Sequence, residues 1–165
     1  MSADAPRRLN IHATGLLLDG AGVLIRGPSG AGKSLLALEL LDRYALMGRP
    51  ALLVADDRLE IERRGQGLLM HAPPVIAGLV ELRGRGLIRR PYIASAPVHL
   101  VVDLVEDWTR MLEESEFETD LFGLALPRSA VPRRGMADPG HQLLLVMEAL
   151  ASLPSTARQG GEKTT

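Results

Sequence analysis

The sequence predicts an α/β domain in which a mixed sheet is flanked by helices. Residues 21–26 are typical of a strand, residues 27–34 are glycine-rich, and residues 34–46 form a helical segment of leucine and alanine that ends at Gly48-Arg49-Pro50. The continuous apolar run at residues 51–55 is typical of a strand buried on both faces. Strand, crossover helix and strand together form a βαβ unit, which we expect to be right-handed.

The glycine-rich segment between the first strand and the helix has the spacing G-x-x-x-x-G-K-[ST]. Its residues are Gly27, Pro28, Ser29, Gly30, Ala31, Gly32, Lys33 and Ser34. Glycines allow the backbone to curl so that several N–H groups point into one concavity at the start of the helix, where an anion is favoured. We expect Lys33 to reach the terminal phosphates of ATP, and the Ser34 hydroxyl to bind Mg²⁺.

Composition limits the other possibilities. The 165 residues suffice for one domain, and we expect it to span residues 9–153, with a flexible segment at 1–8, a disordered tail at 154–165 and no room for an upstream domain. A net charge of −1 and only five aromatic residues give no indication of a nucleic-acid partner. The absence of cysteine excludes disulfides and thiol catalysis, and no apolar run is long enough to span a membrane. We therefore expect a cytoplasmic protein.

The segments around this unit carry strand and turn patterns. Residues 9–18 suit a strand, and Asp19-Gly20 predicts a hairpin turn that pairs it with residues 23–26. Residues 58–64 and 68–71 are expected to form a second hairpin next to the nucleotide site, and residues 75–90 are punctuated by glycine.

The C-terminal part contains a further strand and a helix. Residues 98–105 predict an apolar strand, and the acidic stretch 106–120 predicts a solvated loop or a short helix. Asp138-Pro139 predicts a helix start, with Leu143, Met147 and Leu150 on its packing face.

Two strands end in aspartates that could serve phosphoryl transfer. Asp56 and Asp57 follow the strand at 51–55, at the end of a parallel sheet where ligands bind. This pair offers both a metal ligand and a base, so we favour it. Asp103, in the strand at 98–105, is the open alternative. Glu81, by itself, is expected to form a surface salt bridge, and His12 a structural contact.

Several motifs, in order, resemble the HPr kinase/phosphorylases of bacteria. They are residues 11–15 (Ile-His-Ala-Thr-Gly), 27–34, 53–57 (Leu-Val-Ala-Asp-Asp), 78–86 (Gly-Leu-Val-Glu-Leu-Arg-Gly-Arg-Gly) and 139–142 (Pro-Gly-His-Gln). The resemblance extends from His12 to about Ala151. It implies a nucleotide fold like that of phosphoenolpyruvate carboxykinase, hexameric assembly, and an acceptor serine on HPr, the phosphocarrier of the sugar phosphotransferase system.

The resemblance also implies roles for matching residues. Asp56 would take the proton from the acceptor serine, and His12 would lie beside it and tune its proton affinity. Ser34 and Glu81 would hold Mg²⁺, with Asp57 as a second acidic partner, while Lys33 and the loop amides would bind the phosphates. Arg110 would match an active-site arginine of the family.

The chain departs from the long family form. It resembles the short form, without the separate N-terminal domain, and His141-Gln142 stand where the family has Arg-Asn before the last helix. Since that region supports the reverse reaction in the family, phosphoserine phosphorolysis stays open.

We expect an ATP- and Mg²⁺-dependent serine kinase that acts on HPr or on a paralogous phosphocarrier. A small-molecule P-loop kinase and a non-catalytic nucleotide-sensing module are the alternatives.

Overall fold

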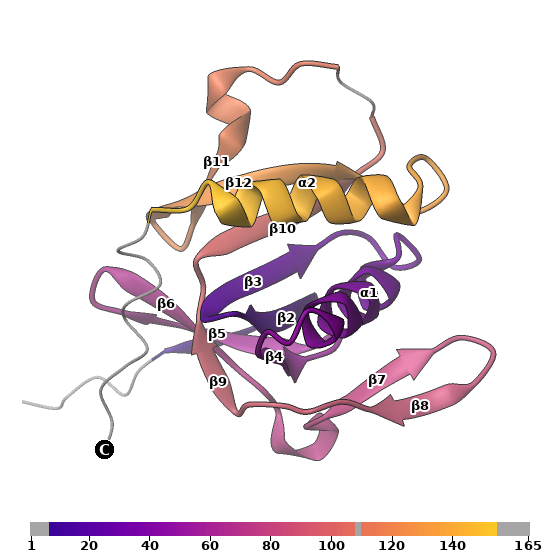
Figure 1. Cartoon of the computed structure of the whole chain (residues 1–165). Coiled ribbons are helices and arrows are strands. Elements are labelled where there is room, and N and C mark those ends of the chain that lie inside the picture. The colour runs from indigo at the N-terminus through magenta and orange to yellow at the C-terminus, as the bar shows by residue number, and fades with distance from the viewer. Residues whose placement is uncertain (1–6, 108–109, 155–165) are drawn as a thin grey trace, which may run out of the picture.

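The computed structural model describes residues 7–107 and 110–154, in which two sheets pack face to face and two helices cover the outer side of the larger one (Figure 1). Of the expected flexible segment at residues 1–8, residues 1–6 lie outside the described part of the chain, whereas Arg8 is the first residue of a strand. Of the expected tail at 154–165, residues 155–165 also lie outside it. Among the described residues, no helix is long and apolar enough to cross a membrane. The α/β fold with a mixed sheet and flanking helices is confirmed.

The larger sheet has six strands in the order β11-β12-β10-β3-β2-β4. Their bounds are β11 (Glu118–Leu121), β12 (Leu124–Pro132), β10 (Leu100–Val105), β3 (Ala21–Arg26), β2 (Ala13–Leu18) and β4 (Ala51–Ala55). β12, β10 and β3 are parallel, whereas β2 is antiparallel to both of its neighbours. The predicted βαβ unit is therefore present, with β2 inserted between its two parallel strands.

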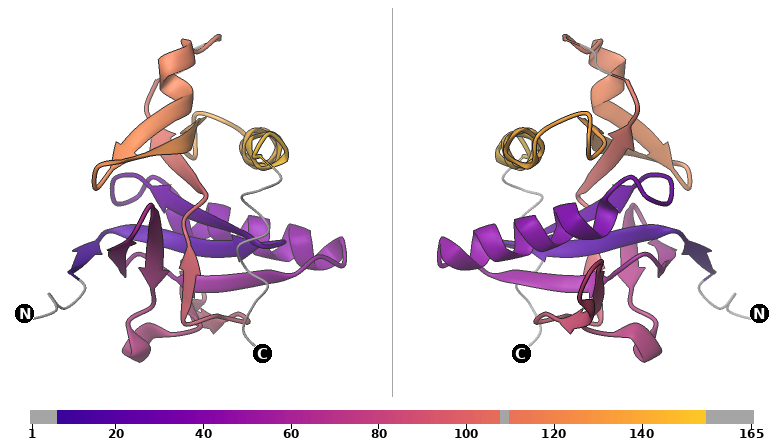
Figure 2. Two further views of the ribbon diagram at one scale, coloured as in Figure 1. Left: turned by 90° about the vertical axis from the view of Figure 1, so that its left-hand side faces the viewer. Right: turned by 90° about the vertical axis from the view of Figure 1, so that its right-hand side faces the viewer.

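Both helices lie on one face of this sheet (Figure 2). They are α1 (Lys33–Leu46) and α2 (Pro139–Ala151). Leucines of α1 pack against strand residues such as Leu16 and Val102 in one buried cluster, which also includes Val146 and Leu150 of α2. Burial of apolar side chains holds α1 in place, so the loop before it is fixed relative to the ends of the strands.

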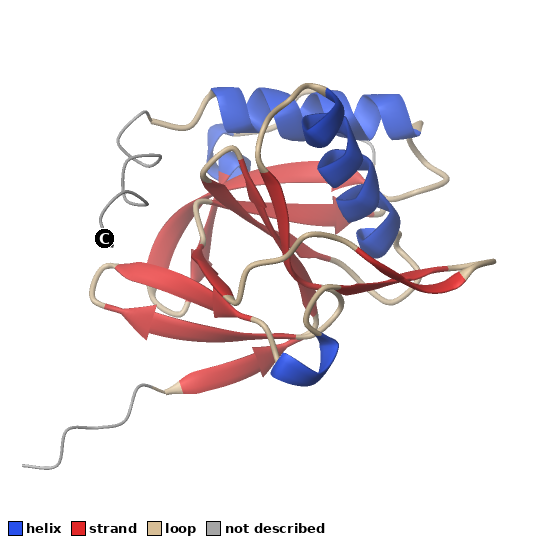
Figure 3. Cartoon of the chain, turned by 60° about the horizontal axis from the view of Figure 1, so that its bottom comes forward, coloured by secondary structure: helices blue, strands red, loops and turns tan. Residues whose placement is uncertain are grey.

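The smaller sheet covers the opposite face (Figure 3). It has the order β1-β5-β6-β9, with β1 (Arg8–Ile11), β5 (Leu59–Arg64), β6 (Gly67–His71) and β9 (Ser95–Pro97). Its inner residues form a second cluster with Leu24, Val54 and Val101 of the larger sheet. The predicted hairpin of residues 58–64 and 68–71 corresponds to β5 and β6 and is confirmed.

A separate two-stranded hairpin projects beside α1 (Figure 1). It consists of β7 (Leu79–Leu82) and β8 (Gly86–Arg89), and it follows the short 3₁₀ helix η1 (Pro74–Ile76). Glycines at the turn have positive φ, as at Gly84 (89°) and Gly86 (108°). The glycine punctuation of residues 75–90 thus marks a tight hairpin.

Two expectations differ from the structure. The single strand expected at residues 9–18 is divided at His12, because residues 8–11 pair with β5 of the small sheet while residues 13–18 pair within the large one. The acidic stretch 106–120 contains the 3₁₀ helix η2 (Glu114–Phe117), as a short helix was expected, but it ends in strand β11, which pairs with residues 124–127 of β12. Residues 108–109 lie outside the described part of the chain.

The last helix confirms its predicted start and most of its packing face. Asp138 is the N-cap residue and Pro139 the first helical residue. Leu143 and Leu150 are buried, while Met147 is half-buried and Val146 takes the central position.

Candidate active site

The glycine-rich loop forms a concave turn at the N-terminus of α1. Gly30 and Gly32 have φ values of 83° and 95°, which L side chains rarely adopt. At Gly32 a Cβ atom would also lie 2.9 Å from the Cβ of Arg134. Lys33 is buried, and its ammonium donates to the carbonyls of Gly27 at 2.8 Å and Pro28 at 3.3 Å. Helix dipole and lysine together make this turn suited to an anion.

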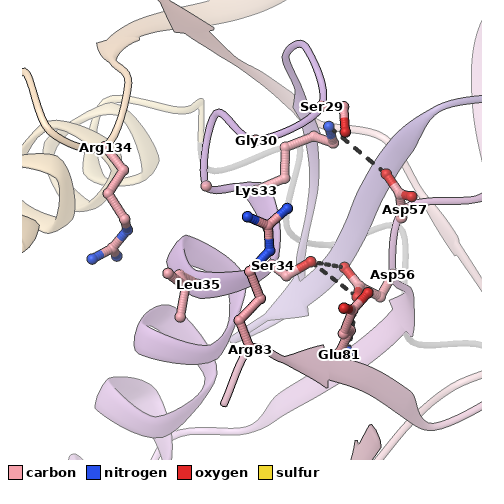
Figure 4. Close-up of a pocket in the computed structure, with 11 residues that line it drawn as sticks. Ser29, Gly30, Lys33, Ser34, Leu35, Asp56, Asp57, Glu81, Arg83 and Arg134 are labelled. Atoms are coloured by element: carbon pink, nitrogen blue, oxygen red, sulfur yellow. Dashed lines mark hydrogen bonds and ion pairs between the residues drawn. The ribbon is translucent and has the colours of Figure 1, made fainter. Parts of the chain in front are cut away.

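A cavity of about 250 Å³ opens at this loop (Figure 4). It is lined by loop and α1 residues, by both aspartates that follow β4, by two residues of the β7–β8 hairpin and by one arginine from the C-terminal part: Ser29, Gly30, Gly32, Lys33, Ser34, Leu35, Asp56, Asp57, Glu81, Arg83 and Arg134. The structure therefore brings together residues that are more than 100 positions apart in the chain.

Asp56 is the most strongly held side chain of the cavity. Its two carboxylate oxygens accept the Ser34 hydroxyl at 2.8 and 3.0 Å, and one of them also accepts the Thr14 hydroxyl at 3.1 Å. The other accepts the backbone N–H of Glu81 at 3.3 Å. These donors come from three different elements, β2, α1 and β7, so the position of the carboxylate is set by the tertiary structure.

Asp57 has different surroundings. Its side chain is 62% exposed and lies 3.7 Å from the Lys33 ammonium. Its φ of 63° places a non-glycine residue in the left-handed region, and its N–H donates to the Thr14 hydroxyl at 3.1 Å. The two neighbouring aspartates therefore have different partners in the cavity, Asp56 being next to Ser34 and Asp57 next to Lys33.

A β-bulge decides which aspartate faces Ser34. Gly15 of β2 pairs with Ala55, but Leu16 pairs with Leu53, so β4 has one extra residue at this point. Val54 and Ala55 consequently both face the small sheet, whereas strict alternation would turn Ala55 toward α1. Asp56 then emerges on the α1 side, within hydrogen-bond distance of Ser34.

The β7–β8 hairpin adds two charged side chains. Glu81 lies exposed at the cavity, and its main chain is tied to Asp56, rather than its side chain forming a surface salt bridge. Arg83 lines the same cavity from the hairpin turn (Figure 4). Glu81 therefore lies in the same cavity as Ser34 and Asp57, and its implied role as a metal ligand stays a prediction.

Arg134 approaches the loop from the opposite side. Its N–H donates to the carbonyl of Ala31 at 3.2 Å, and its guanidinium donates to Glu39 of α1 at 2.7 Å. Sequence reasoning assigned no role in this site to Arg134 or to Thr14. Arg134 belongs to no motif, Thr14 lies in the motif at residues 11–15 without a role of its own, and only the folded chain brings them to the site.

Asp103 does not line the cavity. Its carboxylate accepts hydrogen bonds from Arg26 at 2.8 and 2.9 Å and from Arg128 at 2.6 Å. Burial raises the pKa of Asp103, but the two guanidiniums outweigh burial and hold the pKa below its usual range. Both oxygens are thus engaged by cations, which argues against Asp103 as the metal ligand.

His12 and Arg110 lie elsewhere. His12 is exposed at the junction of β1 and β2, and Thr14, two residues further on, takes the place beside Asp56. Arg110 lines another cavity, which lies between η2, β12 and the start of α2 and also includes His141. The catalytic roles implied for His12 and Arg110 stay predictions.

Comparison with known proteins agrees with the geometry. The family described as the HPr Serine kinase C-terminal domain matches residues 5–164. The HPr kinase/phosphorylase 1 of Oceanobacillus iheyensis is 36% identical over 152 residues, and the HPr kinase/phosphorylase of Bordetella pertussis is 34% identical over 151. These alignments cover 83% and 84% of this chain and 46% of each relative, so the chain spans about half the length of the curated relatives it matches.

A solved structure shares the fold. The Hpr(Ser) kinase/phosphatase from Coxiella burnetii superimposes with a TM-score of 0.69 and 27% identity over 87% of this chain and 97% of that chain. Sequence and structure agree that this chain belongs to the HPr serine kinase C-terminal domain family.

Proposed function

We propose that the protein is a kinase that transfers the γ-phosphoryl group of ATP to a serine of HPr or of a paralogous phosphocarrier. The observation that carries this proposal is the hydrogen-bonded arrangement of Ser34 and Asp56 at the mouth of the glycine-rich loop. Phosphoryl transfer requires groups that position phosphates, a metal and an acceptor at one place, and this cavity offers groups for all three.

The residues of the cavity fit a nucleotide with Mg²⁺. The turn between Gly27 and Lys33 presents backbone donors and a buried lysine to an anion. Among the described residues, no three histidine, aspartate or glutamate side chains form a metal-binding cluster. That fits Mg²⁺, which is held by one or two carboxylates together with substrate phosphates and water. Ser34, Asp57 and Glu81 would hold the ion, and when bound it would neutralise charge on the transferred group.

Asp56 is the proposed general base. It would accept the proton of the acceptor hydroxyl as the serine oxygen forms its bond to phosphorus and the bond to the ADP oxygen breaks. The Ser34 hydroxyl has a single proton, so it can donate a hydrogen bond to one carboxylate oxygen of Asp56 while the other oxygen accepts the hydrogen bond of the acceptor hydroxyl. Lys33 would hold the β- and γ-phosphates in place.

The acceptor, the assembly and the compartment rest on the family. Relatives that match this chain are named HPr kinase/phosphorylase, and we propose HPr or its paralogue as the acceptor, hexamers as the assembly, and the cytoplasm, where ATP and phosphocarriers meet, as the compartment. His141 stands where the family has the arginine of the region that supports the reverse reaction, and it lines the cavity with Arg110 rather than the nucleotide cavity. Phosphorolysis of phosphoserine is therefore not part of this proposal and needs its own assay.

A phosphotransfer assay tests the proposal. The protein is incubated with Mg²⁺, labelled ATP and either HPr or its nitrogen-branch paralogue, beside a family member of known competence. Labelling of a carrier serine is expected. Failure to label both carriers, while the control enzyme labels its own, overturns the proposal. ATP consumption with a metabolite would then indicate a small-molecule kinase, and tight ATP binding without turnover a nucleotide-sensing module.

A further inference from the structure

Thr14 of β2 contacts both aspartates of the cavity through one oxygen atom. Its side chain is fully buried, and its Oγ1 donates to Asp56 at 3.1 Å. The same oxygen accepts the backbone N–H of Asp57 at 3.1 Å. A hydroxyl has one proton to donate and two lone pairs to accept, so both bonds form simultaneously.

The second bond has a structural consequence. Asp57 has a φ of 63°, a conformation that non-glycine residues rarely adopt without support from their surroundings. Its N–H has a partner in Thr14, and its carboxylate is near Lys33. The hydrogen bond from Thr14 thereby stabilises the left-handed backbone conformation at Asp57, which directs this side chain away from Ser34.

The β-bulge in β4 sets the directions of the two aspartates that Thr14 contacts. The extra residue in β4 turns Asp56 toward α1, whereas regular alternation from Leu53 would have turned Asp57 to that side. The bulge lies directly beside Thr14, because Gly15 is the last β2 residue before the shift. At Gly15 a Cβ atom would lie 2.9 Å from the Met70 sulfur and 3.0 Å from a Leu59 methyl, so the close packing of the two sheets requires glycine there.

We propose that Thr14 is a positioning residue that holds Asp56, the carboxylate that the bulge turns toward α1, in its place facing Ser34 and the reacting phosphoryl group, and that keeps Asp57 away from it. The inference rests on the proposed kinase function. Thr14 does not line the cavity, so it acts through the two aspartates and not on the substrate.

Two substitutions at this position separate the hydroxyl from the volume of the side chain. Thr14→Val keeps the shape and removes both hydrogen bonds, whereas Thr14→Ser keeps the hydroxyl. Thr119→Val is the matched control, since it removes the same group from β11, where Thr119 accepts only a 3.4 Å contact from Arg26. All three are compared with the wild-type chain for carrier phosphorylation, for ATP affinity by calorimetry, and for exchange of the Asp57 amide proton by NMR.

We expect Thr14→Val to lower kcat about 10- to 100-fold, the effect of a small misplacement of a reacting group, with ATP affinity within about threefold of wild type. The Asp57 amide should exchange slowly in wild type and Thr14→Ser and at least tenfold faster in Thr14→Val. Thr119→Val should match wild type in all three measurements.

The readouts distinguish this inference from the proposed function. If wild type labels no carrier, the proposed function fails, and slow exchange of the Asp57 amide still reports the contact. Equal kcat in wild type and Thr14→Val overturns the inference, as does fast exchange of the Asp57 amide in wild type. If Thr14→Val fails to fold, Thr14→Ser decides: loss of transfer in this variant, with the hydroxyl retained, also overturns it.

Discussion

Asp56 directly follows strand β4 and Asp103 lies within strand β10 of the same sheet, yet the two aspartates have opposite surroundings. Asp56 accepts hydrogen bonds from two hydroxyls and a backbone amide, in a cavity that also holds Lys33. Asp103 lies on the face of the sheet away from the helices, between two guanidiniums. Neutral donors leave the charge of a carboxylate available for chemistry, whereas two arginines neutralise it.

The difference separates the carboxylate that we propose as the general base from one that has a structural role. Arg26 is the last residue of β3, directly before the glycine-rich loop, and Arg128 belongs to β12 and also donates to the carbonyl of Glu116 in η2. Asp103 thus connects the strand that leads into the loop with the β12 region. An apolar run followed by an aspartate forms the same sequence pattern in both places, and only the side chains brought in from other elements distinguish the two.

The largest effect is expected at Asp56. Asp56→Asn should lower carrier phosphorylation about 10²- to 10⁴-fold, because the amide cannot accept the acceptor proton. Affinity for ATP, measured by calorimetry, should change little, since Lys33 and the loop backbone hold the phosphates. Loss of ATP binding in Asp56→Asn would contradict the role assigned to this carboxylate.

Asp103→Asn should have the reverse profile. Removing the charge leaves two partly buried guanidiniums without their partner, which should lower the free energy of unfolding by about 1–3 kcal/mol. The measurement is urea unfolding followed by circular dichroism, with Asp120→Asn on the exposed part of β11 as control. The fraction that remains folded should phosphorylate the carrier at close to the wild-type rate. A loss of rate as large as that in Asp56→Asn would remove the distinction between the two aspartates.

Acid should weaken the Asp103 contact selectively. Because the arginines hold the folded-state pKa of Asp103 below its usual range, its contribution is fully present above about pH 4 and is lost as pH falls through the folded-state pKa. Urea unfolding at several pH values from 2 to 6 should therefore show a smaller acid-induced loss of stability in Asp103→Asn than in wild type. Identical pH profiles would show that ionisation of Asp103 does not contribute to the pH dependence of stability.

The smallest effect is expected at His99, which fixes the start of β10 against β3. Its Nδ1 accepts the N–H of Gly22 at 2.9 Å, and burial lowers the pKa of the imidazole. The unfolded chain therefore takes up a proton below about pH 6.5 that the folded chain does not, so stability falls as pH decreases below that value. In His99→Asn, which keeps an acceptor but does not titrate, this part of the pH dependence of Tm should disappear. If the pH dependence of Tm is the same in His99→Asn and wild type, another titratable group causes it.

Local patterns predicted much of the fold. The glycine-rich loop, α1 and its end at Gly48, the run at 51–55, the β5–β6 hairpin and the start of α2 all follow from short-range rules of glycine, proline and apolar spacing. The division of residues 8–18 between two sheets and the pairing of β11 with β12 did not, since both depend on partners that are distant in the chain or on an acidic segment without a strand pattern.

The sequence by itself determined the loop, its lysine and serine, and the presence of two adjacent aspartates after a buried strand, because glycine conformation and strand burial act over a few residues. The tertiary structure decided which aspartate faces Ser34, because a one-residue bulge against β2 reverses the side of the sheet on which each side chain emerges. It also decided that Thr14, rather than His12 of the same motif, contacts both aspartates, and that two arginines bind Asp103. Hydrogen-bond partners from separate strands are set only when the strands pack.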